Sequence, residues 1–190
     1  MKKNKILKTL GLFAGAILLV AVSIAGTLAY LTDDDKVTNT FTVGNVAITM
    51  DETDYNEYGQ TKATDNPVQE NKYKLIPNHT YKKDTTIHVA DDSENCYIFV
   101  KVDNGLGDKA TVAISTGWTN ISGTDVYYYN TVATADGDYT AIESFTVSDD
   151  ADVSTLGDKE IVVTGYAVQA DGFDNAEAAW NATFGKPANP

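Results

Sequence analysis

Beyond its apolar N-terminal run, the chain consists mainly of short segments in which hydrophobic and polar residues alternate. These segments are rich in Thr, Val, Ile and Tyr, which fit the pleated surface of a sheet. Clusters of Asp, Asn and Gly separate them, as turns do. The pattern predicts seven strands: Asn39–Met50, Tyr81–Ala90, Asn95–Asp103, Ala110–Trp118, Val126–Thr131, Thr140–Val147 and Glu160–Gln169. Seven or eight short strands of this kind predict an all-β fold, either a sandwich or a jelly roll.

Two of these strands indicate which of their faces is buried. In "CYIFVKVD" the core face is predicted to carry Cys96, Ile98, Val100 and Val102. Tyr97 and Phe99 lie on the opposite face, where either a loop covers them or they form a contact surface. In "IVVTGYAVQ" both faces are apolar, so this strand is expected to be central and covered on both sides. Cys96, the chain's one cysteine, is interpreted as a small buried residue; an intermolecular disulfide is the alternative.

A helix is predicted near the C-terminus, in "DNAEAAWNATFG". Asp174 is the expected cap, and Gly185 ends the helix. Side chains at steps of three and four form an apolar stripe, predicted to pack on the sandwich: Phe173, Ala176, Trp180 and Phe184. The polar stretch from Asp51 to Gln69 is expected to be a long surface loop.

The N-terminus has the layout of a secretory signal peptide. Lysines at positions 2, 3, 5 and 8 precede an apolar run from Leu10 to Ala29. The small residues Thr27 and Ala29 predict cleavage before Tyr30. The run is also long enough to span a bilayer, so an uncleaved anchor is the alternative. The expected organisation is a signal peptide (1–29), a mature N-terminal segment (30–40), a β-sandwich domain (41–186) and a polar tail (187–190).

Charge narrows the range of partners. After cleavage ten lysines remain against 27 acidic residues, a formal net charge of −17, and the chain has no arginine. Nucleic acid is therefore excluded as a partner, because no basic patch is available to neutralise phosphates. Membrane contact is expected only during export.

The motifs of common enzymes are missing from the sequence. The two histidines, His79 and His88, form no HExxH motif, and neither a phosphate-binding glycine loop nor GxSxG occurs. We therefore expect no enzymatic activity, no catalytic residues and no metal site. Clusters of acids recur at Asp33–Asp35, Asp91–Glu94 and Asp149–Asp152, without EF-hand spacing. No cofactor is expected beyond weak, collective Ca2+ binding by these acidic loops.

The N-terminal region resembles one family of secreted proteins. A Gly26–Ala29 step is followed by Tyr30–Asp33, then by Asn39-Thr40-Phe41 and an alternating strand from Gly44 to Met50. This order is similar to that of the TasA, CalY and camelysin family of Gram-positive bacteria, whose members are processed by the signal peptidase SipW. Two later segments, Leu75–Asn104 and Gly165–Trp180, also resemble members of this family.

The resemblance implies a jelly-roll-like antiparallel β-sandwich and a structural role in biofilm matrix or cell-surface fibres. Subunits of such fibres join when the mature N-terminal segment is donated as a strand to the next subunit. In this chain the candidate donor segment is Val37, Thr38, Asn39, Thr40 and Phe41, with Val37 and Phe41 as pocket-filling anchors. The implied partners are further copies of the chain and, during export, a SipW-like signal peptidase. Asp33–Asp35 is poor strand material, so an unordered tail is the alternative.

Two other functions remain open at the level of sequence. Camelysin-like members are described as metallopeptidases, although no motif here carries that activity. A monomeric surface adhesin would instead bind a ligand through exposed tyrosines such as Tyr127 to Tyr129.

Overall fold

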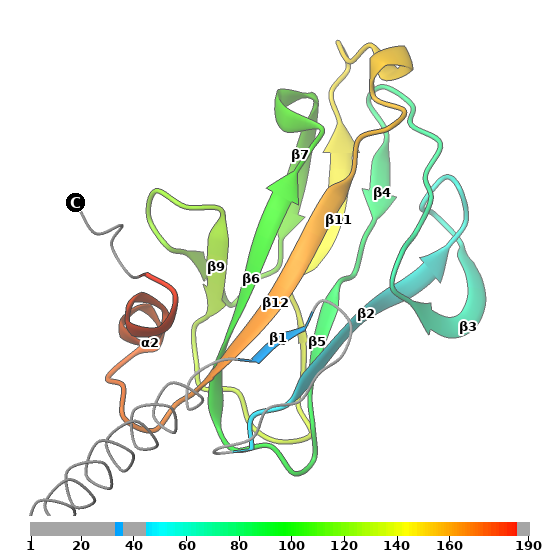
Figure 1. Cartoon of the computed structure of the whole chain (residues 1–190). Coiled ribbons are helices and arrows are strands. Elements are labelled where there is room, and N and C mark those ends of the chain that lie inside the picture. The colour runs from blue at the N-terminus through cyan, green and yellow to red at the C-terminus, as the bar shows by residue number, and fades with distance from the viewer. Residues whose placement is uncertain (1–32, 36–44, 186–190) are drawn as a thin grey trace, which may run out of the picture.

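The computed structural model describes residues 33–35 and 45–185, and their fold is an all-β sandwich (Figure 1). Every strand pair is antiparallel, and one short helix lies near the C-terminus. The predicted fold class, a jelly-roll-like antiparallel β-sandwich with one packed helix, is confirmed. The strands are β1 (Asp33–Asp35), β2 (Ile48–Tyr55), β3 (Lys62–Val68), β4 (Thr80–Lys82), β5 (Thr86–Val89), β6 (Cys96–Asn104), β7 (Ala110–Ile114), β8 (Trp118–Asn120), β9 (Val126–Tyr129), β10 (Asp138–Thr140), β11 (Ile142–Val147) and β12 (Ile161–Gln169).

The largest sheet has the order β1-β12-β6-β9-β8. Its centre is the ladder between β6 and β12, which is in register from Ile161↔Asn104 to Gln169↔Cys96. Two further sheets have the orders β10-β5-β2-β3 and β4-β11-β7. The predicted single strand Tyr81–Ala90 is split between them, because the chain passes from β4 in one sheet to β5 in the other.

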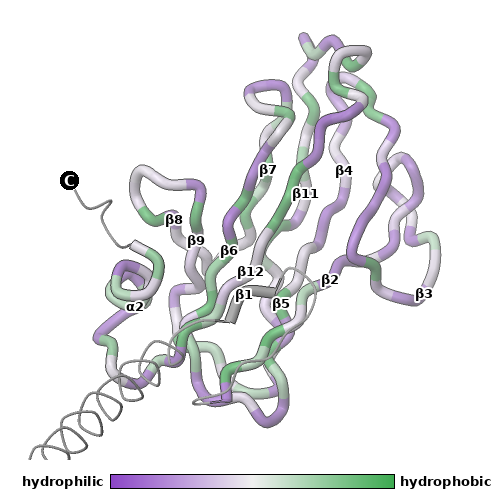
Figure 2. Tube along the Cα trace, viewed as in Figure 1, coloured by the Kyte–Doolittle hydropathy of each residue, from purple (hydrophilic) through white to green (hydrophobic). Residues whose placement is uncertain are grey.

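The main core lies between the five-stranded sheet and the strands β2 and β5. The alternation in β6 is as predicted: Cys96, Ile98, Val100 and Val102 belong to this core, together with Ile48 and Ile87. Gly165 of β12 lies opposite β2, where a Cβ atom would be 3.4 Å from Met50 Sδ and 3.5 Å from Ile87 Cδ1. Both distances are ordinary van der Waals contacts, so β12 packs directly on β2 and β5 at this position. Figure 2 shows the hydrophobic residues with which β12 begins.

The other face of the large sheet is covered by helix α2 (Ala176–Thr183). Phe99 is fully buried there, with its ring centroid 5.1 Å from that of Trp180. The predicted stripe packs as expected, since Ala176 is buried and Phe173, Trp180 and Phe184 lie against the same cluster. A helix, not a loop or a partner, therefore covers Tyr97 and Phe99. The predicted cap was wrong by one residue: the Asn175 side chain, not that of Asp174, accepts the hydrogen bond from Ala178 N, at 2.9 Å.

The expectation of a surface loop from Asp51 to Gln69 was wrong. β2 continues to Tyr55, and β3 pairs with it along the edge of the sheet. β3 is polar and exposed on both faces, so it has no hydrophobic periodicity to reveal it. Pro67 is tolerated because β3 is an edge strand.

Truncating Phe99 tests the packing of α2 on the sheet. We expect Phe99→Ala to lower the free energy of unfolding by about 3–5 kcal/mol, because it removes a fully buried aromatic ring. Val162→Ala, at a position that is 39% exposed, is the control and should change it by less than about 0.5 kcal/mol. Urea denaturation measures both values, and equal effects of the two variants would contradict the observed packing.

Candidate functional site

In the part of the chain that the structure describes, one edge of β12 is only partly paired. β6 pairs with β12 along its whole length, whereas β1 pairs with three residues on the other side: Asp33↔Ala167, Asp34↔Tyr166 and Asp35↔Gly165. Within the described residues, no strand pairs with Ile161–Thr164 on the side of β1. This stretch offers backbone donors and acceptors to an additional strand.

The edge strand β3, which belongs to the four-stranded sheet, differs from this stretch of β12 in its residue types. β3 carries Lys62, Asp65 and Pro67, and charged side chains and proline are features that discourage further pairing at an edge. Ile161, Val162, Val163 and Thr164 include no such residue. Of these two edges, β12 is the one suited to strand addition.

A pocket of about 950 Å3 lies beside the open stretch of β12. Its walls come from β2, from residues 68–75 that follow β3, and from residues 156–163 that lead into β12. Apolar side chains line much of it: Leu75, Leu106, Phe145, Leu156, Ile161 and Val163. Such a pocket can receive apolar side chains from a strand added to β12.

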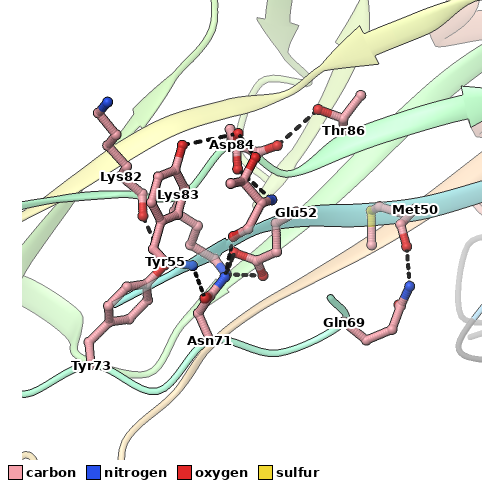
Figure 3. Close-up of polar contacts among 11 residues, drawn as sticks. Met50, Glu52, Tyr55, Gln69, Asn71, Tyr73, Lys82, Lys83, Asp84 and Thr86 are labelled. Atoms are coloured by element: carbon pink, nitrogen blue, oxygen red, sulfur yellow. Dashed lines mark hydrogen bonds and ion pairs between the residues drawn. The ribbon is translucent and has the colours of Figure 1, made fainter. Parts of the chain in front are cut away.

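The polar side of this pocket contains a buried ion pair (Figure 3). Lys83 Nζ lies 2.8 Å from Glu52 Oε1, and the two residues are only 7% and 6% exposed. Asn71 Nδ2 donates to Glu52 Oε2 at 3.2 Å. Nearby, Asp84 accepts hydrogen bonds from Thr53 N at 2.9 Å and from the Thr53 hydroxyl at 2.6 Å. Burial, reinforced by the charges of Glu52 and Asp84, raises the pKa of Tyr73, so this phenol stays neutral.

Periodicity in the sequence could have revealed this ion pair, which sequence reasoning missed. Glu52 follows Ile48 and Met50 at steps of two, on one face of β2. Every second residue from Tyr81 to Val89 is buried, and Lys83 and Thr85 belong to this series. A charged residue in phase with a buried apolar series is the signal.

His88 forms a second polar cluster, on the four-stranded sheet. Its Nδ1 lies 2.6 Å from Asp138 Oδ1 on β10, and its Nε2 lies 3.1 Å from Asp51 Oδ1 on β2. Burial lowers the pKa of His88, but hydrogen bonds to Asp138 and Asp51 and their negative charges outweigh it and raise the pKa above its usual value. The His88 imidazole therefore links three neighbouring strands, and its protonated form is favoured there.

The structure places the other predicted residues as follows. Thr27, Ala29 and Tyr30, and the donor segment from Val37 to Phe41, lie outside the described residues. His79 Nε2 lies 2.9 Å from the Tyr58 carbonyl oxygen and has no partner in common with His88. In residues 33–35 and 45–185, no group of three or more His, Cys, Asp or Glu could hold a metal ion.

Cys96 is fully buried in the core, and burial raises the pKa of its thiol to about 12.

The tyrosines of β9 differ from the expectation. Tyr127 and Tyr129 are half-buried against the main core, and Tyr128 packs in the cluster under α2. They are not the exposed aromatic surface that the adhesin interpretation expected, because β9 is an inner strand of its sheet.

No family model matches the chain, and neither a curated protein nor a solved structure matches it. The resemblance to the TasA, CalY and camelysin family therefore remains a prediction from the sequence. Among the described residues, none of the helices has the length and apolar character needed to cross a bilayer.

The His88 cluster generates a pH-dependent prediction. The folded-state pKa of His88 lies above its unfolded value of about 6.5. Its stabilising contribution is therefore complete below pH ~6.5 and is lost as the pH rises through the folded-state pKa. We expect His88→Gln to destabilise the protein more at pH 5.5 than at pH 8.5, as measured by urea denaturation. In an Asp138→Asn background this difference should shrink, and a loss that is equal at both pH values would contradict the ion-pair role.

Proposed function

We propose that this chain is a secreted structural subunit of an extracellular protein fibre, in a biofilm matrix or on the cell surface, and that it assembles by β-strand addition. The observation that carries the proposal is the stretch Ile161–Thr164, which no described residue pairs on the side of β1, beside a pocket lined in part by apolar side chains. β1 already pairs with the adjoining part of the same edge, from within the chain. In a fibre, the same segment of a second copy would take this edge in place of the chain's own.

The register of β1 specifies what would come next on this edge. Asp33↔Ala167 and Asp35↔Gly165 define an antiparallel pairing. Continued without a bulge, it sets Val37 opposite Val163 and Thr38 opposite Val162. Opposed residues of an antiparallel pair share a face of the sheet. Val163 packs against the main core and lines the pocket, so Val37 would come to the pocket side.

The same reasoning distinguishes the donor residues from one another. Val37, Asn39 and Phe41 alternate with Thr38 and Thr40, so the two apolar residues share one face. In the extrapolated register that face would be directed to Leu75, Phe145 and Leu156, which supports Val37 and Phe41 as the anchors. Pairing within one chain corresponds to a monomer, and exchange of the segment between copies corresponds to a fibre.

Charge controls when this exchange takes place. Each subunit beginning at Tyr30 carries a formal charge of −17, so subunits repel one another. At physiological salt the repulsion is screened over a Debye length of about 8 Å. Salt, divalent cations or a pH near the sequence pI of 4.3 lower the barrier. Weak cation binding by the acidic loops would act in the same direction.

The alternatives receive less support from the geometry. A camelysin-like metallopeptidase needs metal ligands close together, whereas His79 and His88 have separate partners. A monomeric adhesin that uses Tyr127 to Tyr129 would need these rings exposed, and they are half-buried.

Changing the two faces of the donor segment separately tests the proposal. The chain beginning at Tyr30 should be monomeric at neutral pH and low salt, and form fibres at pH near 4.3 or with added calcium. Replacing both anchors, Val37→Ser with Phe41→Ser, should abolish fibres, because the apolar contacts with the pocket are lost.

The matched control, Thr38→Ser with Thr40→Ser, should still polymerise. Deleting residues 30–40 should leave a folded, β-rich monomer, because the core strands lie outside that segment. Size-exclusion chromatography and negative-stain microscopy provide the measurements. Fibres from the deleted chain would refute strand donation by this segment, and a monomer under every condition would refute the fibre.

A further inference from the structure

The side chains of Lys83, Glu52 and Asn71 contact one another beside the pocket. Strand addition at β12 does not explain this polar cluster. Glu52 uses both carboxylate oxygens: Oε1 lies 2.8 Å from Lys83 Nζ, and Oε2 accepts from Asn71 Nδ2 at 3.2 Å. Figure 3 shows the Lys83 and Asn71 side chains directed at this one carboxylate. Glu52 thus holds the Lys83 amine on one carboxylate oxygen and the Asn71 carboxamide on the other, so it can exchange protons with both groups.

The hydrogen bonds of Asn71 fix the orientation of its amide. Nδ2 also donates to the Thr53 carbonyl oxygen at 2.9 Å, so both acceptors lie on the nitrogen side. Oδ1 accepts from the Tyr55 backbone N–H at 2.8 Å. A fixed backbone donor at a carbonyl oxygen stabilises the negative charge that develops when a nucleophile attacks the carbon.

The Lys83–Glu52 ion pair is largely shielded from water. Lys83 and Glu52 are both buried, and the adjoining Tyr73 ring packs edge-on against Phe145, with centroids 5.3 Å apart. Burying an ion pair costs desolvation free energy, and an apolar pair of similar size often makes the folded state equally stable. Stability alone therefore does not explain why a lysine and a glutamate are buried together here.

We propose that Lys83 and Asn71 become joined by an intramolecular isopeptide bond, with Glu52 as the catalytic proton carrier. Lys83 Nζ gives a proton to Glu52, and its lone pair attacks Asn71 Cγ while the Cγ–Oδ1 π electrons move onto Oδ1. Glu52 passes protons from Nζ to Nδ2, and the Oδ1 electrons re-form the Cγ–Oδ1 π bond as the Cγ–Nδ2 bond breaks. The nitrogen leaves as ammonium and the Glu52 carboxylate is regenerated, so no oxidant or other reactant is consumed.

The bond would close a loop from Asn71 to Lys83. It would tie the segment after β3 to the chain between β4 and β5, along one wall of the pocket. Its formation needs only the folded chain and does not depend on fibre assembly.

Peptide mapping of the purified, denatured protein tests the proposal. Trypsin does not cleave after an acylated lysine. We therefore expect a branched peptide in which residues 63–72 are joined to residues 83–101, lighter than the sum of the two by one ammonia, about 17 Da. Recovery of only linear 63–72 and 84–101 would overturn the proposal.

Three variants assign the roles. Lys83→Arg keeps the positive charge but removes the amine nucleophile, so the branched peptide should vanish. Lys82→Arg, at the exposed neighbouring lysine, is the matched control and should retain it. Glu52→Gln should remove the branched peptide while the circular dichroism spectrum remains that of a β-protein. A branched peptide formed in full by Glu52→Gln would overturn the role of Glu52, and one formed by Lys83→Arg would overturn that of Lys83.

Discussion

The pairing of β12 is the constraint on which the rest of the structure depends. Nine residues pair with β6, one face of the strand meets β2 and β5 through Gly165 and Ala167, and the other face meets α2 through Val168. These contacts hold the strand in place, and within the described part of the chain the second edge of β12 is only partly paired. Among the described residues, β1 pairs with three positions of that edge, and the positions that follow lie beside a pocket. A rigid strand with an incomplete edge is suited to accept another strand, because little order remains to be gained on binding.

The sequence predicted the fold where side chains alternate clearly. The buried face of β6 and the apolar stripe of α2 follow directly from periods of two and of three to four residues. β3 was missed because a polar edge strand lacks this alternation, and its Pro67 suggested a loop. Glu52 and Lys83 were missed because a charged residue was taken to be solvent-exposed, although each lies in phase with a buried series. The cap of α2 moved from Asp174 to Asn175, since either side chain can accept the capping bond and only the backbone geometry decides.

The two proposals concern opposite sides of one pocket. β12 supplies the edge for strand addition, and β2, with the residues after β3, supplies Glu52 and Asn71. A covalent bond from Asn71 to Lys83 would hold that wall in place while a donated strand is exchanged, since it limits the conformations open to residues 71–83. Either proposal holds without the other, because one depends on contacts between chains and the other on chemistry within a single chain.

Disulfide capture between two variants that each carry one added cysteine tests the central claim most directly. Thr38→Cys in one chain and Val162→Cys in another would be opposed on the β12 edge only if the donor strand comes from a second copy. The native Cys96 does not interfere, because it is fully buried and its pKa is raised to about 12. Mixed under assembly conditions and oxidised, the two variants should give a covalent heterodimer, whereas Thr38→Cys mixed with Glu143→Cys, at an exposed position of β11, should not. Fibres that form without the Thr38–Val162 cross-link, or that cross-link equally with the Glu143 variant, would contradict strand addition at β12.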